Sequence, residues 1–329
     1  MTANRINWID WGKVFAIYLV ILGHLLSSKG AEGWMFDFVY LFHMPFFFFI
    51  SGYLFSVKES KVADLLKRTA KSLLLPYLLL NLVSNFFLIP SWVLSKQMPV
   101  ESLMYFLTAD GRGESGPTWF LICLAWVWFI AWFLLKCERW MQYVLLLVCA
   151  VAAYLLPVHL FWRLDTALMV VPFFMVGHYL KNKIRQGVLK GLLVFVPCMV
   201  ATVWMTGVMG YANTYLLQYG QYPLLYYPAA FLGIFMLMGF CMMFDKMAFK
   251  VIRVSSTGTI LIMALHGIAI LYVKSAMKHL FGIYFDEYDT CQKALLALVS
   301  LIVLYYPIVL SQKYFPALMG NRGRHGAKQ

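Results

Sequence analysis

Residues 9–28 read IDWGKVFAIYLVILGHLLSS. The run is apolar over about the 20 residues that a bilayer core requires of a spanning helix. It differs from a simple membrane anchor because it carries Asp10, Lys13 and His24. A cleavable signal peptide normally keeps its apolar core free of charge, so we expect this segment to be retained.

The rest of the chain repeats this apolar pattern. Hydrophobic residues make up 62% of the 329 residues and charged residues only 12%, whereas soluble domains carry about 25% charged residues. The excess of apolar side chains must face the lipid bilayer. We therefore predict an all-α fold, a polytopic bundle of about ten transmembrane helices that forms a single domain over residues 1–329. The predicted spans are roughly 9–28, 34–56, 72–95, 118–136, 140–158, 164–181, 189–208, 223–244, 256–277 and 293–314.

The net charge of +13 comes from basic residues gathered in alternate connections between these spans. Lys and Arg accumulate in the cytoplasmic loops of membrane proteins. The pattern therefore predicts that both termini lie in the cytoplasm and that the protein is integral to the inner membrane, with no nucleic-acid partner. The connections predicted to be cytoplasmic hold Lys58, Lys61, Lys67, Arg68, Lys71, Lys136, Arg139, Lys181, Lys183, Arg185, Lys190, Lys246, Lys250 and Arg253.

The six cysteines lie mostly within or beside the apolar runs, and no two of them form a C-x-x-C pair. This spacing is typical neither of a disulfide framework nor of a zinc site. We therefore predict that the protein uses no metal.

Lys13 and His24 are eleven positions apart in the first span. At about 100° per residue, eleven steps return to nearly the same helix face and rise about 16 Å. Asp10 precedes Lys13 by three residues and can pair with it. Alone, Lys13 can snorkel to the interface and His24 can pack against a neighbouring helix. Two ionisable groups on one stripe inside a membrane favour a functional role instead, because such groups are costly there.

The second span contains FHMPFFFFISGYL at residues 42–54, which places His43 inside the membrane. Small residues such as those at Ser51-Gly52 predict a close contact with another helix. Arg68 and Lys71 lie in what we predict to be a cytoplasmic loop. They form either a patch that sets the topology or a clamp for phosphate groups.

Several further polar residues lie near the predicted ends of spans. The connection 96–117 contains a Gly-rich run and is predicted to be a loop that covers a site. Trp119 follows it at the start of the fourth span. Arg163 and Asp165 open the sixth span, where they can bind a polar acceptor or face water. His266 lies in the middle of the ninth span.

In their order and spacing, these residues resemble the acyltransferase-3 family of integral membrane acyltransferases over essentially the whole chain. The matching elements are Lys13 with His24, the FHMPFFF and ISGYL stretches around His43, Arg68-x-x-Lys71, PTWFL at 117–121, PFF-x-x-G at 172–177 and Leu265-His266-Gly267.

The resemblance implies transfer of an acyl group, usually acetyl from acetyl-CoA, to a hydroxyl of a carbohydrate. It also implies that His24 is catalytic and that Lys13 contacts the acyl-CoA donor. The family usually has Arg at the position of Lys13, and Arg again at the position of Lys71. Lys keeps the charge but loses the bidentate fork of Arg, so the donor contacts depart from the family pattern.

We predict that His24 is the general base that accepts the proton of the acceptor hydroxyl. His43 either orients His24 or contacts the oxyanion, and Asp10 is grouped with them as a catalytic candidate. Lys13, Arg68 and Lys71 are candidates for binding the phosphates of acetyl-CoA. The candidates for contacts with the carbohydrate acceptor are Trp119, Arg163, Asp165 and His266.

A proton-coupled transporter or flippase is the alternative, because intramembrane Lys and His also suit proton coupling. The sequence shows no internal repeat of the kind found in many transporters. A structural scaffold would leave the ionisable residues of the spans without a purpose. The identity of the acceptor glycan, the acyl group and the presence of an acyl-histidine intermediate all stay open at this point.

Overall fold

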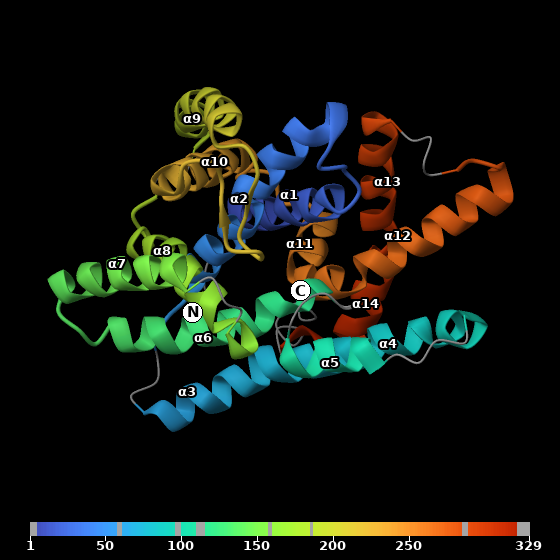
Figure 1. Ribbon diagram of the computed structural model, residues 1–329, viewed down its shortest axis with the longest axis horizontal. Helices are drawn as coiled ribbons and strands as arrows, with labels where there is room; N and C mark the ends of the chain where they lie inside the picture. The colour runs from blue at the N-terminus through green and yellow to red at the C-terminus, as the bar shows by residue number, and fades with distance from the viewer. Residues whose placement is uncertain are drawn as a thin grey trace. The chain divides into compact units, whose positions relative to one another are not determined.

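The computed structural model describes residues 5–57, 61–95, 100–109, 116–156, 160–184, 187–284 and 289–320 (Figure 1). The chain forms two compact units, each assembled from separate stretches of sequence. The first unit comprises Met1–Ser56, Cys137–Pro157 and Leu168–Ser256, and the second comprises Val57–Lys136, Val158–Ala167 and Thr257–Gln329.

The first unit is built from apolar helices and one small hairpin. Its helices are α1 (Asn7–Gly23), α2 (Gly33–Leu54), α7 (Arg139–Leu155), most of α8 (Leu164–Tyr179), α9 (Val188–Met209), α10 (Tyr226–Met242) and nearly all of α11 (Lys250–Thr257). Helices α9 and α10 lie side by side, as Figure 1 shows. In the connection from α9 to α10, β1 (Ala212–Asn213) pairs antiparallel with β2 (Gln218–Tyr219).

The second unit contains α3 (Val62–Thr69), α4 (Leu75–Ser95), α5 (Val100–Thr108), α6 (Trp119–Leu134), α12 (Thr259–Phe281), α13 (Thr290–Val303) and α14 (Tyr305–Tyr314). A π-helical segment, Ala70–Leu74, joins α3 to α4 without interruption. Short 3₁₀ turns at Gly116–Thr118, Phe161–Arg163 and Pro316–Met319 complete the unit.

Within the described residues, six helices are long and apolar enough to cross a membrane. They are Gly30–Leu54, Val62–Phe87, Val188–Met209, Pro223–Met242, Thr259–Phe281 and Thr290–Tyr314, and the shorter apolar helices Trp119–Leu134 and Arg139–Leu155 accompany them. The prediction of an all-α, multi-pass membrane protein is confirmed. The count of ten spans and the orientation of the termini stay predictions.

Two predicted loops contain helices, and these predictions were wrong. Residues 66–71, which carry Arg68 and Lys71, belong to α3 and the π-helical segment. Lys and Arg are good helix formers, so a dense run of them does not by itself mark a loop. The connection 96–117 contains α5, and its Gly-rich run at 111–115 lies outside the described residues.

Two helices of the first unit, α2 and α8, pack closely against each other at glycine residues. A Cβ atom at Gly52 of α2 would overlap the carbonyl oxygen of Phe174 in α8, and one at Gly177 of α8 would overlap the carbonyl oxygen of Phe49. The backbones of α2 and α8 therefore touch where only glycine leaves room. The predicted close contact at Gly52 is confirmed, and the neighbouring residues 46–49 are buried phenylalanines of the core.

Candidate active site

The end of α1 places His24 beside α2. Helix α1 ends at Gly23, one residue before His24, although the sequence predicted that His24 lies inside the helix. His24 keeps a helical backbone conformation, and its N–H donates to the carbonyl of Val20 at 3.2 Å. A Cβ atom at Gly23 would lie 3.1 Å from the Tyr40 ring and 3.4 Å from Val39 of α2. The two helices are thus in contact immediately before His24.

His43 lies one turn along α2 from this contact. Its side chain is buried, and its Nδ1 lies 2.7 Å from the carbonyl oxygen of Val39. A carbonyl can only accept, so Nδ1 carries the proton and a neutral His43 presents Nε2 as an acceptor. His43 is also close enough to His24 for the two imidazoles to interact electrostatically. His24 is an exposed residue just past the helix end, whereas His43 is buried.

Asp10 and Lys13 lie toward the other end of α1. At 1.5 Å per residue, Asp10 is about 21 Å and Lys13 about 16 Å from His24 along the helix axis. The half-buried Lys13 and His24 are therefore separated along the axis of α1, and their depths in the membrane stay a prediction. Asp10 is too far from His24 to touch the same reacting atoms.

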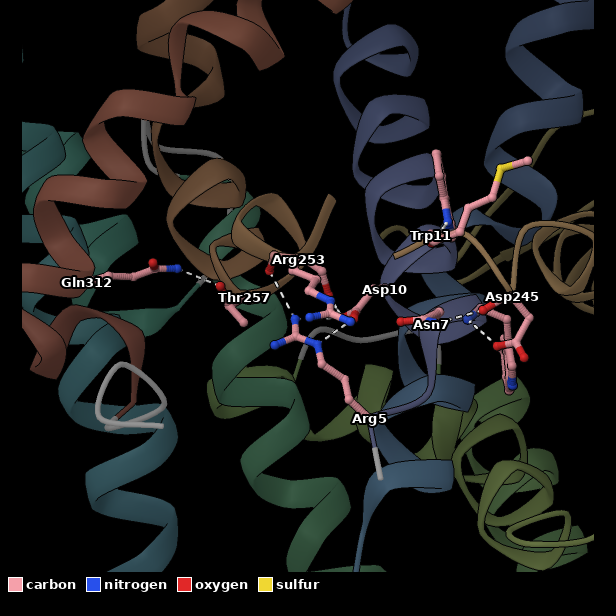
Figure 2. A network of polar contacts seen from close by, with 11 residues as sticks. Arg5, Asn7, Asp10, Trp11, Asp245, Arg253, Thr257 and Gln312 are labelled. Atoms are coloured by element: carbon pink, nitrogen blue, oxygen red, sulfur yellow. Dashed lines mark hydrogen bonds and ion pairs between the residues drawn. The ribbon is translucent and has the colours of Figure 1, made fainter. Parts of the chain in front are cut away.

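Asp10 belongs to a polar network at the start of α1, which Figure 2 shows. Its buried carboxylate accepts hydrogen bonds from Arg5 Nε at 2.6 Å and from Ser256 Oγ at 2.6 Å. Arg5 also donates to the carbonyl oxygen of Arg253 at 3.1 Å. The sequence predicted Lys13 as the partner of Asp10, and it missed Arg5 because Arg5 precedes the helix.

Asp245 provides a second connection at the same helix end. Its carboxylate accepts a hydrogen bond from the backbone N–H of Trp8 at 3.0 Å, and its carbonyl oxygen accepts one from the Asn7 side chain at 2.7 Å. Trp11 Nε1 donates to the carbonyl oxygen of Met247 at 3.0 Å. A carboxylate at a helix N-terminus satisfies unpaired N–H groups and complements the helix dipole. Residues 245–256 thus fix the start of α1.

These contacts predict that Asp10 stabilises the fold. Replacing Asp10 with Asn removes the charge that Arg5 and Ser256 bind, at a cost of about 1–2 kcal/mol, so we expect the melting temperature to fall by about 3–6 °C. The turnover per folded molecule should change by less than about twofold. Thermal unfolding followed by tryptophan fluorescence, together with rates normalised to folded protein, checks both values. A loss of turnover of more than a hundredfold at unchanged stability would show that Asp10 takes part in catalysis.

In the second unit, the cationic candidates lie on the helix that runs from α3 into α4. The guanidinium of Arg68 lies over the ring of Trp128 from α6, 4.7 Å from its centroid. Lys71 is exposed one turn further along, in the π-helical segment. Stacking on an aromatic ring fixes the plane of a guanidinium.

Trp119, Arg163 and Asp165 are all buried in the second unit. Arg163 and Asp165 lie within electrostatic range of the buried Cys123, one turn of α6 beyond Trp119. The alternative in which they face water is therefore wrong. Trp162 and Arg163 have φ values of 54° and 59°, a left-handed conformation that costs non-glycine residues free energy and persists only where the surroundings enforce it.

His266 lies on α12 of the same unit and is buried. Its Nδ1 is 2.9 Å from the carbonyl oxygen of Met263, so a neutral His266 also presents Nε2 as an acceptor.

Helix α4 contributes two buried polar residues that the sequence analysis did not single out. Asn81 Nδ2 donates to the carbonyl oxygen of Tyr77 at 2.8 Å and to Thr118 Oγ1 at 3.1 Å. Ser84 Oγ donates to the carbonyl oxygen of Ala264 at 3.4 Å. The sequence feature that could have identified them is the spacing of Tyr77, Asn81 and Ser84, which places three polar groups on one face of an apolar helix.

The predicted site residues divide between the two units. The first unit holds Asp10, Lys13, His24 and His43, and places the two histidines within electrostatic range of each other. The second unit holds the other candidates, which are Arg68, Lys71, Trp119, Arg163, Asp165 and His266. In the part of the chain that the structure describes, no three His, Cys, Asp or Glu side chains gather as metal ligands would.

These features define a multi-pass membrane protein with a histidine pair where α1 meets α2. The family model for an acyltransferase domain, acyltransferase family 3, matches residues 6–311. The chain therefore belongs to the acyltransferase-3 family, as its motifs predicted.

Among curated proteins, the chain is similar to nodulation protein NolL of Mesorhizobium japonicum, with 33% identity over 146 residues. The match covers 41% of this chain and 36% of the relative, so it spans about a third of that protein's length. No solved structure matches the chain.

Proposed function

We propose that this protein is a membrane-embedded O-acyltransferase of the cytoplasmic membrane. It transfers an acyl group, expected to be acetyl, from acyl-CoA to a hydroxyl of a carbohydrate, namely a cell-surface polysaccharide or its lipid-linked precursor. One observation carries the proposal: His24, just past the end of α1, lies within electrostatic range of the buried His43 of α2 in a chain of the acyltransferase-3 family.

In the proposed reaction, the acceptor hydroxyl oxygen attacks the thioester carbonyl carbon. A neutral His24 accepts the hydroxyl proton as the new C–O bond forms, because an unassisted sugar hydroxyl is a poor nucleophile. Collapse of the tetrahedral intermediate then breaks the C–S bond. The proton passes from His24 to the leaving thiolate, which yields the ester, free CoA thiol and neutral His24.

The hydrogen bond of His43 favours one of its two candidate roles. Since Nδ1–H donates to the Val39 carbonyl, a neutral His43 offers only an acceptor at Nε2. An acceptor can receive an N–H and so orient the imidazole of His24, whereas an oxyanion needs a donor. We therefore assign His43 as a positioning residue for His24.

The donor is an anion whose phosphates require cationic partners. Lys13, Arg68 and Lys71 are the groups that we propose for this task. Arg68 suits it best, because its fork can bind two phosphate oxygens at once while its face rests on Trp128.

Replacing Arg68 with Gln should raise the KM for acetyl-CoA by about tenfold with little change in kcat, because one charge-assisted contact to the bound donor is lost. Lys67→Gln is the matched control, since Lys67 is exposed on the same short helix. Steady-state kinetics with acetyl-CoA as the varied substrate measures the effect. Equal KM values for the two variants would exclude Arg68 from donor binding.

Proton-coupled transport or flipping of a glycan is the competing function, because intramembrane histidines also serve as proton relays. A single experiment separates the two. The purified protein is placed in liposomes with acetyl-labelled acetyl-CoA and alkali-deacetylated cell-surface glycan. Acyl transfer predicts an alkali-labile labelled ester on the glycan and one free CoA thiol per acetyl group. Accumulation of glycan inside the vesicles without ester formation would favour transport.

A further inference from the structure

A line of aromatic rings leads from the hairpin of the first unit to the histidine pair. Tyr211, which precedes β1, packs against α2 with its ring centroid 5.4 Å from Phe36 and 6.0 Å from Tyr40. Tyr40 in turn meets the ring of His43 edge-on at 5.0 Å. Because Phe36, Tyr40 and His43 recur every three or four residues, they share one face of α2.

The hairpin holds Tyr211 in a fixed position. Asn213 Nδ2 donates to the phenolic oxygen of Tyr211 at 2.5 Å. The Asn213 side-chain oxygen accepts hydrogen bonds from the backbone N–H groups of Tyr215 at 2.9 Å and Leu216 at 3.2 Å. The amide is thereby locked by its own turn, so the Tyr211 ring is set in place before any ligand arrives.

Asp37 adds a carboxylate within electrostatic range of this ring. It lies one turn before Tyr40 on α2 and interacts electrostatically with Tyr211. Burial raises the pKa of the Tyr211 phenol, the hydrogen bond from Asn213 lowers that pKa, and the carboxylate of Asp37 raises it. Tyr211 therefore stays neutral at physiological pH and can both donate and accept a hydrogen bond.

The residues around Tyr211 are more exposed than the residues that the sequence predicted to contact the carbohydrate acceptor. Asp37, Tyr40 and Tyr211 are all half-buried, so each keeps part of its surface available to a ligand. The group formed by Trp119, Arg163, Asp165 and His266 is buried throughout.

Aromatic rings next to a carboxylate match the chemistry of a sugar. The C–H groups on one face of a pyranose ring pack against an aromatic ring, which offers rigid area with a polar edge. Sugar hydroxyls donate to carboxylate oxygens, and charge-assisted hydrogen bonds of this kind are the strong ones. We propose that Asp37, Tyr40 and Tyr211 form the acceptor subsite, which holds the sugar ring whose hydroxyl is presented to His24. This inference rests on the proposed function.

The test measures acceptor and donor kinetics separately in proteoliposomes. The probes are acetyl-labelled acetyl-CoA and alkali-deacetylated cell-surface glycan. Tyr211→Ala and Asp37→Asn should each raise the acceptor KM by about tenfold, the size expected for one aromatic contact or one charged hydrogen bond. The donor KM should stay within about twofold of wild type. Tyr211→Phe, which keeps the ring, should recover most of the acceptor affinity.

Tyr222→Ala is the matched control, because Tyr222 lies in the same connection and is 49% exposed. It should leave both KM values unchanged. Each variant is first checked for a single symmetric peak in size-exclusion chromatography and for wild-type donor KM, so that misfolding is recognised. Wild-type acceptor KM in both Tyr211→Ala and Asp37→Asn would overturn the subsite while leaving the proposed function intact. A wild-type protein that transfers no label to the glycan would overturn both.

Discussion

Replacing His24 with Gln is expected to lower the rate of acyl transfer by about 10²–10⁴-fold, the range that a positioned general base contributes. Glutamine keeps a polar side chain of similar length but cannot take up the proton of the acceptor hydroxyl. The fold should tolerate the change, because His24 is an exposed residue just past the end of α1. Initial rates of labelled acetyl transfer, normalised to folded protein, measure the loss.

His279→Gln is the matched control for this substitution. His279 is an exposed histidine in the last turn of α12, and its replacement should leave the rate unchanged. If His24→Gln retains the full transfer rate at normal protein yield, His24 is not the base and the proposed mechanism fails.

Replacing Gly52 with Ala is expected to have the largest effect on stability. The added methyl group would overlap the carbonyl oxygen of Phe174, and a backbone atom inside a helix cannot move aside as a flexible side chain can. Helices α2 and α8 must then separate, at a cost that we expect to exceed about 3 kcal/mol. The yield of monodisperse protein in detergent and its melting temperature should both fall sharply.

Gly207→Ala provides the comparison, because a Cβ atom at Gly207 of α9 meets nothing within 4 Å. Alanine favours a helix over glycine by about 1 kcal/mol, so this variant should be as stable as wild type or slightly more stable. Equal melting temperatures for the Gly52 and Gly207 variants would mean that α2 and α8 do not make the close crossing described above.

Composition and periodicity predicted the membrane helices because lipid imposes a simple rule on every span. A run of charged residues is a less reliable sign of a loop. The basic residues around Arg68 indicated a loop, yet they lie on a helix. A helix near the membrane surface can carry them because long cationic side chains extend toward the interface. The hairpin after α9 gave no signal either, because two-residue strands are too short to show an alternating pattern.

The candidate site was predictable only in part. His24 and His43 were found because an ionisable residue inside an apolar run is unusual. The partner of Asp10 was missed because helical spacing points only to residues on the same helix, whereas Arg5 lies before α1 and Ser256 lies 246 positions away. Tyr211 was missed because a tyrosine in a connection is ordinary until the fold places it against Tyr40.

The most direct test of the account is mass spectrometry of cell-surface glycans from cells that express the wild-type protein, no protein or His24→Gln. We predict that glycans from wild-type cells carry an alkali-labile acyl ester, expected to be acetyl, and that this ester is absent from the other two samples. The mass of the ester would also identify the acyl group. Identical ester content in all three samples would contradict the assignment of this protein as an O-acyltransferase of surface carbohydrate.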